Sequence, residues 1–204
     1  MLRFCVAGAS GRMGNAIISE ATATGHEIVG AIEAPNSPSI GRSLRELGIT
    51  NSDTKIFSSD RVSEAVRDAD VYISFTVPAA ELVNIPIVAN LGKRIILGTT
   101  GFNPEQNRQV IEVMSGKVPA VFSPNYSVGV NILFKLAEAL KAFPQGYDFS
   151  LSEIHHTRCQ PFCRTTAVSP CRASRTATSS TCRGRVVGTL LGAPSSLPPS
   201  NQWD

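Results

Sequence analysis

The chain has 204 residues, which is enough for one large domain or two small ones with a substantial buried core. Its hydrophobic content of 42% and charged content of 17% are typical of a soluble globular protein. A net charge of +3 is too small to indicate a nucleic-acid-binding protein. No apolar run approaches the roughly 20 residues of a membrane span, and no signal peptide is recognisable, so we expect a cytoplasmic protein.

Strand-like and helix-like patterns alternate along residues 1–158. The apolar runs predict strands at 2–8, 26–33, 54–59, 70–76, 93–101, 118–124 and 147–156. Helical spacing predicts helices at 11–24, 59–66, 79–91, 103–116 and 127–143, and we expect Pro86 to kink or interrupt the third. Residues 35–53 are rich in turn formers and are predicted to be a loop. This alternation predicts an α/β fold with a parallel sheet and helices on both faces.

Three glycines, Gly8, Gly11 and Gly14, follow the first strand and open the first helix. Glycines here let the backbone approach a pyrophosphate, and the helix N-terminus offers free N–H groups. Glu33 ends the second strand, where an acid binds the adenosine ribose hydroxyls of a dinucleotide. A tight turn that binds nothing and an ordinary surface acid are the alternatives.

The charges near Glu33 predict the cofactor preference. The next residue is Ala34, and no basic residue directly follows the acid to accept a 2′-phosphate. A carboxylate at Glu33 would repel that phosphate, so we expect NADH to be preferred to NADPH. Arg12, inside the glycine loop, leaves some tolerance for NADPH.

Two further loops, "FTVP" (75–78) and "GTTG" (98–101), follow the fourth and fifth strands. Ligands of open α/β sheets bind beyond the carboxyl ends of the strands. These loops are therefore placed to line the nicotinamide side, although ordinary turn chemistry would explain either loop alone.

Five motifs in order, "GASGRMG", "FTVP", "GTTGF", "SPNYSVGVN" and "EIHH", closely resemble those of dihydrodipicolinate reductase, also called 4-hydroxy-tetrahydrodipicolinate reductase. The resemblance covers about residues 1–158. It implies a two-domain reductase of the diaminopimelate route to lysine. Such an enzyme passes a hydride from NADH or NADPH to an unsaturated pyridine-type dicarboxylate and usually assembles as a tetramer through its second domain.

The resemblance assigns roles by position. It implies that the adenosine ribose is bound by Glu33, and that the pyrophosphate is bound by Gly8, Ala9, Ser10, Gly11, Arg12 and Met13. It also implies that Gly98, Thr99 and Thr100 flank the nicotinamide. The hinge segment that touches the cofactor would consist of Ser123, Pro124, Asn125 and Tyr126. His155 matches the proton-handling histidine and His156 the substrate-contacting one. Without the family context, a solvated turn is the alternative for this pair.

The sequence divides into three parts. Residues 1–125 are predicted to form a Rossmann dinucleotide-binding domain, and residues 126–158 to begin an α+β substrate and oligomerisation domain. Residues 159–204 lack helical or strand periodicity and hold five arginines, one acid and four of the five cysteines. Because charge, cysteine content and periodicity all change between Arg158 and Cys159, we interpret 159–204 as a disordered or frame-shifted tail.

The family pattern also stops at this boundary. Where the family has a lysine and then an Asp-Ala-Pro-Ser-Gly-Thr loop, this chain has Cys159 and "QPFCRTTAVSPC". We therefore expect cofactor binding without turnover, and we do not expect the family's tetramer from this C-terminus. The tail cysteines are spaced by 3, 7 and 10 residues, which is no structural zinc pattern, so no metal is predicted.

Two other functions are compatible with parts of the sequence. One is an NAD(H)-binding remnant without catalysis, and the other is a different Rossmann amino-acid dehydrogenase, such as an aspartate dehydrogenase-like enzyme. The combination of "SPNYSVGVN" with "EIHH" argues against the second. The tail arginines lack interleaved aromatic residues and any known module, so no nucleic-acid partner is predicted.

Overall fold

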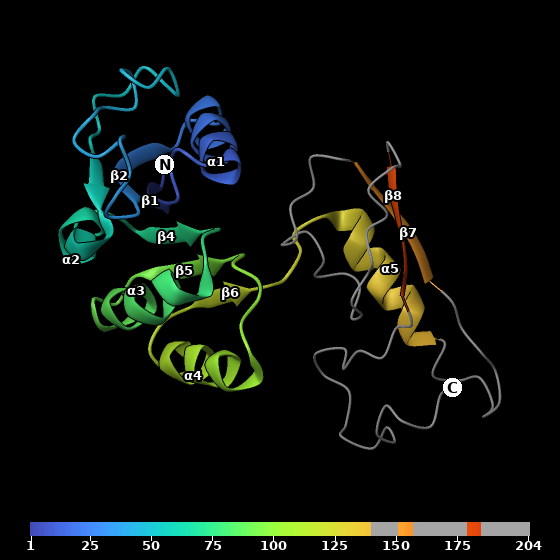
Figure 1. The fold of residues 1–204 in the computed structure, drawn as a ribbon. Coiled ribbons are helices and arrows are strands. Elements are labelled where there is room, and N and C mark those ends of the chain that lie inside the picture. The colour runs from blue at the N-terminus through green and yellow to red at the C-terminus, as the bar shows by residue number, and fades with distance from the viewer. Residues whose placement is uncertain (140–150, 157–178, 185–204) are drawn as a thin grey trace. The chain divides into compact units, whose positions relative to one another are not determined.

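The computed structural model describes residues 1–139, 151–156 and 179–184, and the chain divides into two compact units at residues 131 and 132 (Figure 1). The first unit contains a six-stranded sheet with its helices. The second contains most of helix α5 and a pair of strands. No helix within the described ranges is long and apolar enough to cross a lipid bilayer.

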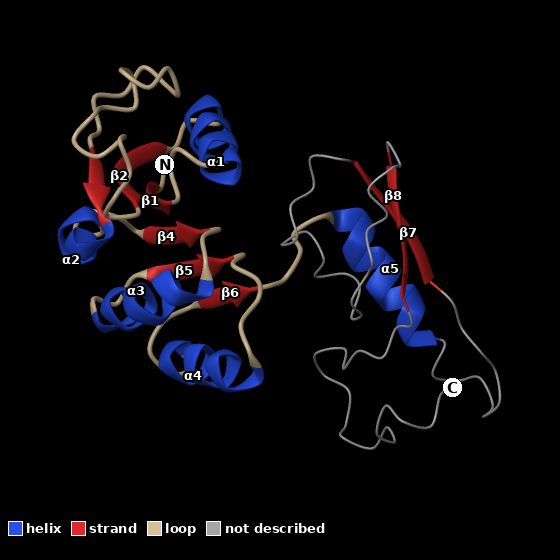
Figure 2. Ribbon diagram, in the orientation of Figure 1, coloured by secondary structure: helices blue, strands red, loops and turns tan. Residues whose placement is uncertain are grey.

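The sheet of the first unit is parallel throughout, with strand order β3-β2-β1-β4-β5-β6 (Figure 2). Its strands are β1 Arg3–Ala7, β2 Glu27–Glu33, β3 Ile56–Ser58, β4 Val71–Ser74, β5 Arg94–Leu97 and β6 Ala120–Phe122. The order reverses between β1 and β4, as in the doubly wound Rossmann arrangement. The predicted α/β fold class is confirmed.

Helices cover both faces of this sheet. They are α1 Arg12–Ala23, α2 Val62–Ala65 after the short 3-10 turn Ser59–Arg61, α3 Pro78–Asn90 and α4 Pro104–Met114. In β1, Cys5 and Ala7 pack in the hydrophobic cluster of α2, α3 and α4, whereas Val6 packs in the cluster of α1. This alternation follows from the two-residue period of a strand, and it gives the sheet two separate cores.

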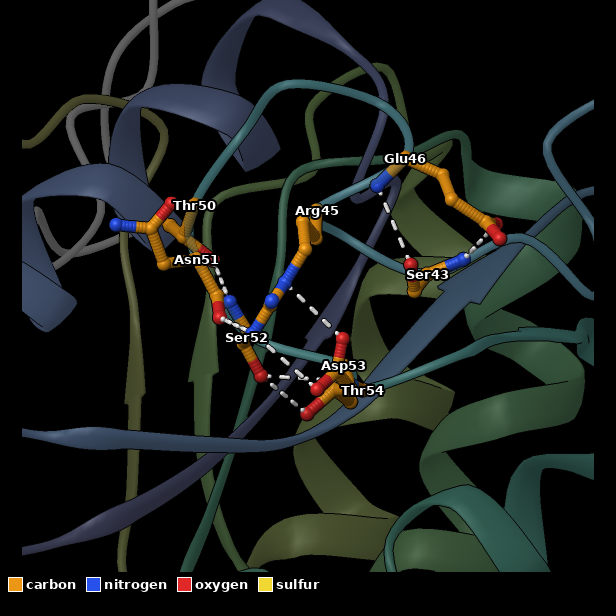
Figure 3. A network of polar contacts seen from close by, with 8 residues as sticks. All are labelled: Ser43, Arg45, Glu46, Thr50, Asn51, Ser52, Asp53 and Thr54. Atoms are coloured by element: carbon orange, nitrogen blue, oxygen red, sulfur yellow. Dashed lines mark hydrogen bonds and ion pairs between the residues drawn. The ribbon is translucent and has the colours of Figure 1, made fainter.

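The long connection between β2 and β3 is built on polar contacts (Figure 3). The Ser43 N–H donates to the Glu46 carboxylate at 2.8 Å, and the Glu46 N–H donates to Ser43 Oγ at 3.2 Å. Arg45 pairs with Asp53 at 3.1 Å. Between these pairs, Leu44 lies fully buried in the cluster beside α1. The segment predicted as a loop is therefore a loop with an apolar anchor.

The predicted elements of residues 1–139 all have counterparts in the structure. A capping box starts α4, with the Gln106 N–H donating to Asn103 Oδ1 at 2.8 Å and the Asn103 N–H donating to Gln106 Oε1 at 3.0 Å. Of the two expectations for Pro86, the interruption is wrong, because α3 continues from Pro78 to Asn90, and the kink stays a prediction. Pro86 removes one helical hydrogen bond, but the fully buried Ile85 and Val88 on either side hold the helix on the sheet.

The second unit is described only in part. Helix α5 runs over Val128–Ala139, and strands β7 Leu151–His156 and β8 Ser179–Gly184 pair antiparallel. The predicted helical residues 140–143 and strand residues 147–150 lie outside the described residues. Strand β8 lies within the tail, where no strand was predicted, because "SSTCRG" lacks the apolar alternation by which a strand is recognised.

We expect Gly30→Ala to destabilise the first unit by about 1–3 kcal/mol, as overpacking does in well-packed cores. A Cβ at Gly30, in the middle of β2, would overlap the Ala65 carbonyl oxygen of α2 and crowd Cys5 Sγ. Gly129→Ala is the matched control, since its Cβ would meet only ordinary contacts and a helical alanine is favourable. Urea unfolding of both variants measures the difference, and equal stability would contradict the packing described for Gly30.

Candidate functional site: the carboxyl edge of the sheet

The candidate site lies at the carboxyl ends of β1 and β4, which are neighbours in the sheet. From β1 the chain continues into α1 on one face, and from β4 it continues into α3 on the other. The loops that leave the two strands therefore diverge, and the crevice at such a switch point is where open α/β sheets bind ligands.

The glycine loop after β1 is shaped by close backbone contacts. Gly8 has φ +71°, a conformation that disfavours any other residue, and its N–H donates to the Ile32 carbonyl at 2.8 Å. A Cβ at Gly14 would overlap the Gly8 carbonyl oxygen. Helix α1 can therefore start directly against the loop, and this leaves a backbone cradle of the kind that holds a pyrophosphate.

The first turn of α1 supplies unpaired donors to this cradle. Gly11 is the N-cap and provides no side-chain cap, and the first turn has no acidic residue. The N–H groups of Arg12 and Met13 have no preceding helical turn to bond to. These donors and the positive end of the helix dipole fit a diphosphate dianion.

Glu33 lies beside the same loop, at the end of β2. Both the N–H and the hydroxyl of Ser10 donate to its Oε1, each at 2.7 Å. Within the described residues, Oε2 accepts no hydrogen bond. The side chain of Glu33 is thus fixed by the glycine loop, and Oε2 stays able to accept a hydrogen bond from a ligand.

The loops after β4, β5 and β6 come together at the carboxyl ends of these neighbouring strands. The Gly98 N–H donates to the Ser74 carbonyl at 2.8 Å, and a Cβ at Gly98 would overlap the Phe75 ring. The rings of Phe75 and Tyr126 lie 5.4 Å apart between centroids. The structure therefore brings "FTVP", "GTTG" and the segment 123–126 into one cluster, as predicted, with Thr100 half-buried at its edge.

The segment 123–126 is a tight turn fastened to β5 and β6. The Ser123 N–H donates to the Leu97 carbonyl at 3.1 Å, and Ser123 Oγ donates to the Asn125 carbonyl at 2.7 Å around the exposed Pro124. The Tyr126 hydroxyl lies 3.0 Å from the carbonyl oxygens of both Leu97 and Val121. Partial burial raises the pKa of Tyr126, so this side chain serves as a neutral hydrogen-bond donor.

A buried polar network that the sequence did not predict lies behind these loops. Glu81 of α3 has 0% exposure, and its Oε1 accepts hydrogen bonds from Ser74 Oγ at 2.7 Å and Thr76 Oγ1 at 2.6 Å. The buried Tyr72 hydroxyl lies 3.2 Å from Oε1 and accepts a bond from Asn84 at 3.1 Å. Burial raises the pKa of both Glu81 and Tyr72 above their ordinary values.

The sequence did contain a signal for this network. Hydroxyl residues alternate at 72, 74 and 76, which places them on one face of the strand and its extension. Glu81 and Asn84, three residues apart on the following helix, share one helical face, and Glu81 is the only acid in α3.

The predicted histidines lie in the second unit. His155 and His156 end strand β7, where they pair in register with Ser180 and Ser179 of β8. All the predicted cofactor residues lie in the first unit. The assignment of the histidines to the substrate stays a prediction.

Other features of the first unit offer no competing site. In the described ranges, no group of three or more His, Cys, Asp or Glu residues is arranged to hold a metal ion. The groove between α3 and α4 is lined by apolar side chains such as Leu82, Ile85 and Val113 and encloses no space for a water molecule. It is a packing contact between two helices.

Comparison with known proteins agrees with this geometry. The family model described as "Dihydrodipicolinate reductase, N-terminus" matches residues 2–126. The chain belongs to this family. The match confirms the resemblance noted in the motifs, and it covers every residue assigned above to the cofactor.

Curated relatives of the family extend the match. The 4-hydroxy-tetrahydrodipicolinate reductase of Nitrosomonas europaea is 41% identical over 157 residues, 76% of this chain and 58% of the relative. Those of Citrifermentans bemidjiense and Methanococcus maripaludis (strain C5) are 37% and 39% identical over 76% of this chain, and 58% and 60% of their own lengths are covered. The chain thus spans under two thirds of the length of these relatives.

Solved structures support the fold. A dipicolinate-bound dihydrodipicolinate reductase from Paenisporosarcina sp. TG-14 matches 85% of this chain and 69% of its own with a TM-score of 0.55 and 22% identity. An amine dehydrogenase from Mycobacterium smegmatis matches 75% of this chain and 47% of its own with a TM-score of 0.56 and 16% identity. Both agree with a Rossmann-type first unit.

The raised pKa of Glu81 predicts a pH-dependent stability. Below the pKa of the unfolded state the carboxyl is protonated in both states. As the pH rises from there through the raised folded pKa, only the unfolded state releases its proton at first, so stability falls. Glu81→Gln lacks this proton, and we expect its stability relative to the original chain to improve over the same range.

Urea unfolding of both proteins at a series of pH values checks this, because the other titrating groups are shared and cancel in the difference. Parallel stability curves would show that Glu81 titrates in the folded state as it does in the unfolded chain.

Proposed function

We propose that the chain binds NAD(H) through its first unit and is a reductase of the 4-hydroxy-tetrahydrodipicolinate type, in the diaminopimelate route to lysine. The observation that carries the cofactor proposal is the backbone cradle between β1 and α1, with the carboxylate of Glu33 fixed beside it. The names of the curated relatives support the reaction. A cytoplasmic location belongs to the same proposal.

The bound nicotinamide would supply the hydride, and the chain's own residues would hold and orient the cofactor. Within the segment Gly8–Met13, the N–H groups of Arg12 and Met13 would bind the pyrophosphate at the positive end of α1, because the other N–H groups of the segment donate to atoms of the protein. Glu33 would accept hydrogen bonds from the adenosine ribose through Oε2. Gly98, Thr99 and Thr100, with the turn at 123–126, would flank the nicotinamide at the other end of the crevice.

The preference for NADH follows from charge. A 2′-phosphate would have to sit next to the Glu33 carboxylate, and like charges at such distances repel. The neighbouring Ala34 offers no compensating cation, and Arg12 is the single basic residue of the glycine loop. We therefore propose NADH as the preferred cofactor, with weaker binding of NADPH.

The substrate side of the proposal rests on the second unit. A dicarboxylate such as 4-hydroxy-tetrahydrodipicolinate suits hydrogen-bond donors, and a histidine titrates close enough to neutrality to manage a proton. We assign proton handling to His155 and substrate contact to His156, at the end of β7. Residues 126–158 would then begin the substrate and oligomerisation domain, and residues 159–204 would be an atypical tail.

One sequence observation favours a second candidate, an NAD(H)-binding protein without turnover. Cys159 stands where the family's lysine is expected, and no Ser-Gly-Thr loop follows it. Loss of a positioned acid typically lowers a rate by about 10²–10⁴. The tail also lacks the pattern on which the family's tetramer would depend, so the two candidates differ in activity and assembly but agree on the cofactor.

We expect the original chain to bind NADH more tightly than NADPH. Glu33→Gln should weaken NADH binding about tenfold and reduce the difference between the NADH and NADPH affinities. The reason is that hydrogen bonds to a charged acceptor contribute roughly 1.5–3 kcal/mol. Glu27→Gln, at the opposite end of the same strand, is the control and should bind like the original chain. Fluorescence titrations with both nucleotides measure the effect, and tighter NADPH binding by the original chain would overturn the preference.

Turnover is expected only when the residues after Arg158 are replaced by the family's lysine and Ser-Gly-Thr loop in frame. NADH oxidation with freshly prepared dihydrodipicolinate, measured on both chains, tests this. Replacing His155 by Gln in the active chain should lower the rate by about 10²–10⁴ with unchanged NADH affinity. Robust turnover by the original chain would instead show that the lysine and loop are dispensable.

A further inference from the structure

Glu81 is an unexpected residue to bury. Transferring a carboxylate out of water is costly unless it is well hydrogen-bonded or neutralised. No Lys, Arg or His of the described residues pairs with it. Its partners are hydroxyl groups from β4 and the loop that follows.

The strongest of these bonds hold residues at the end of β4. Ser74 is the last residue of the strand, and Thr76 lies two residues beyond it, outside the described ladder. Both hydroxyls lie within 2.7 Å of the same oxygen, Glu81 Oε1. One acceptor on α3 therefore fixes the side-chain torsion of Thr76 where the strand no longer fixes the backbone.

Thr76 in turn contacts the loops of both neighbouring strands. Its N–H donates to Thr99 Oγ1 at 3.0 Å, and Thr99 is only 1% exposed. Its Cγ2 lies so close to Gly8 that a Cβ there would come within 3.1 Å. A movement of Thr76 would disturb the loop after β5, to which it is hydrogen-bonded. The Gly8 turn is also held by its own hydrogen bond to the Ile32 carbonyl, and the contact between Ser10 and Glu33 lies farther along the sheet.

From this geometry we infer that Glu81 is a positioning residue for the nicotinamide end of the cofactor site. Its Oε1 holds Thr76, and through the hydrogen bond from the Thr76 N–H it holds Thr99 in place. The inference rests on the proposed NAD(H) binding. It adds that a buried residue, which is not among those proposed to contact the cofactor, determines how well the nicotinamide half is bound.

The test compares NADH with ADP-ribose, which lacks the nicotinamide. Glu81→Met removes the acceptor while keeping the side-chain length, and it should weaken NADH binding at least tenfold with less than a twofold change for ADP-ribose. Glu81→Gln keeps an acceptor oxygen at the same place and should bind both ligands like the original chain. Calorimetric titration of the full chain measures all six affinities.

Thr76→Val is the second variant, and it keeps the branched shape while removing the hydroxyl. It removes the same hydrogen bond from the other end, so it tests the inference even if Glu81→Met fails to fold. Introduced alone, Thr76→Val should weaken NADH binding at least tenfold. Where the double variant folds, adding Thr76→Val to Glu81→Met should cause little further loss.

The outcomes distinguish a failure of the proposed NAD(H) binding from a failure of the role inferred for Glu81. If the original chain binds neither NADH nor ADP-ribose, the proposed function fails. If it binds both, equal weakening of the two ligands by Glu81→Met, or unchanged NADH binding in either variant, overturns the role of Glu81. Fully additive losses in the double variant would show that Thr76 acts without Glu81.

Discussion

The contact on which the site depends is the one between the start of α1 and the carbonyl of Gly8. No side chain fits at Gly14, so the helix axis approaches the turn as closely as backbone atoms allow. This approach aims the first N–H groups of α1 at the crevice between β1 and β4. It also brings the loop near β2, where Ser10 meets Glu33. A backbone contact thus fixes both the anion-binding donors and the acceptor beside them.

Two carboxylates at this edge of the sheet serve opposite purposes. Glu33 is partly exposed, and its partners occupy only one of its oxygens, so it can bind a ligand. Glu81 is fully buried and accepts its hydrogen bonds from hydroxyl groups of the protein, so it is not available to a ligand. Burial raises the pKa of Glu81. Position relative to the sheet edge, rather than residue type, decides the role.

The sequence was sufficient for the fold of the first unit, because glycine spacing, strand alternation and helical spacing all act locally. Gly8, Gly14 and Glu33 were identified for the same reason. Glu81 was missed because its partners are set by tertiary packing: α3 had to be placed against β4 before the hydroxyls at 72, 74 and 76 could be seen to share one acceptor. Tertiary packing also explains why Pro86 does not interrupt α3, since buried neighbours offset its missing hydrogen bond. Strand β8 carries no local apolar pattern at all.

The residues proposed to bind the cofactor and the histidines proposed to carry out the chemistry lie in different parts of the chain. The family match ends at residue 126, and the first compact unit ends at residue 131, so the cofactor residues share one set of packing contacts. His155 and His156 belong to the second unit, whose paired strands depend on tail residues 179–184. On the proposed assignment of the histidines, a change in the tail would remove proton transfer without altering the glycine cradle or the Glu81 network. For this reason cofactor affinity and turnover are independent measurements on this protein, and the first does not imply the second.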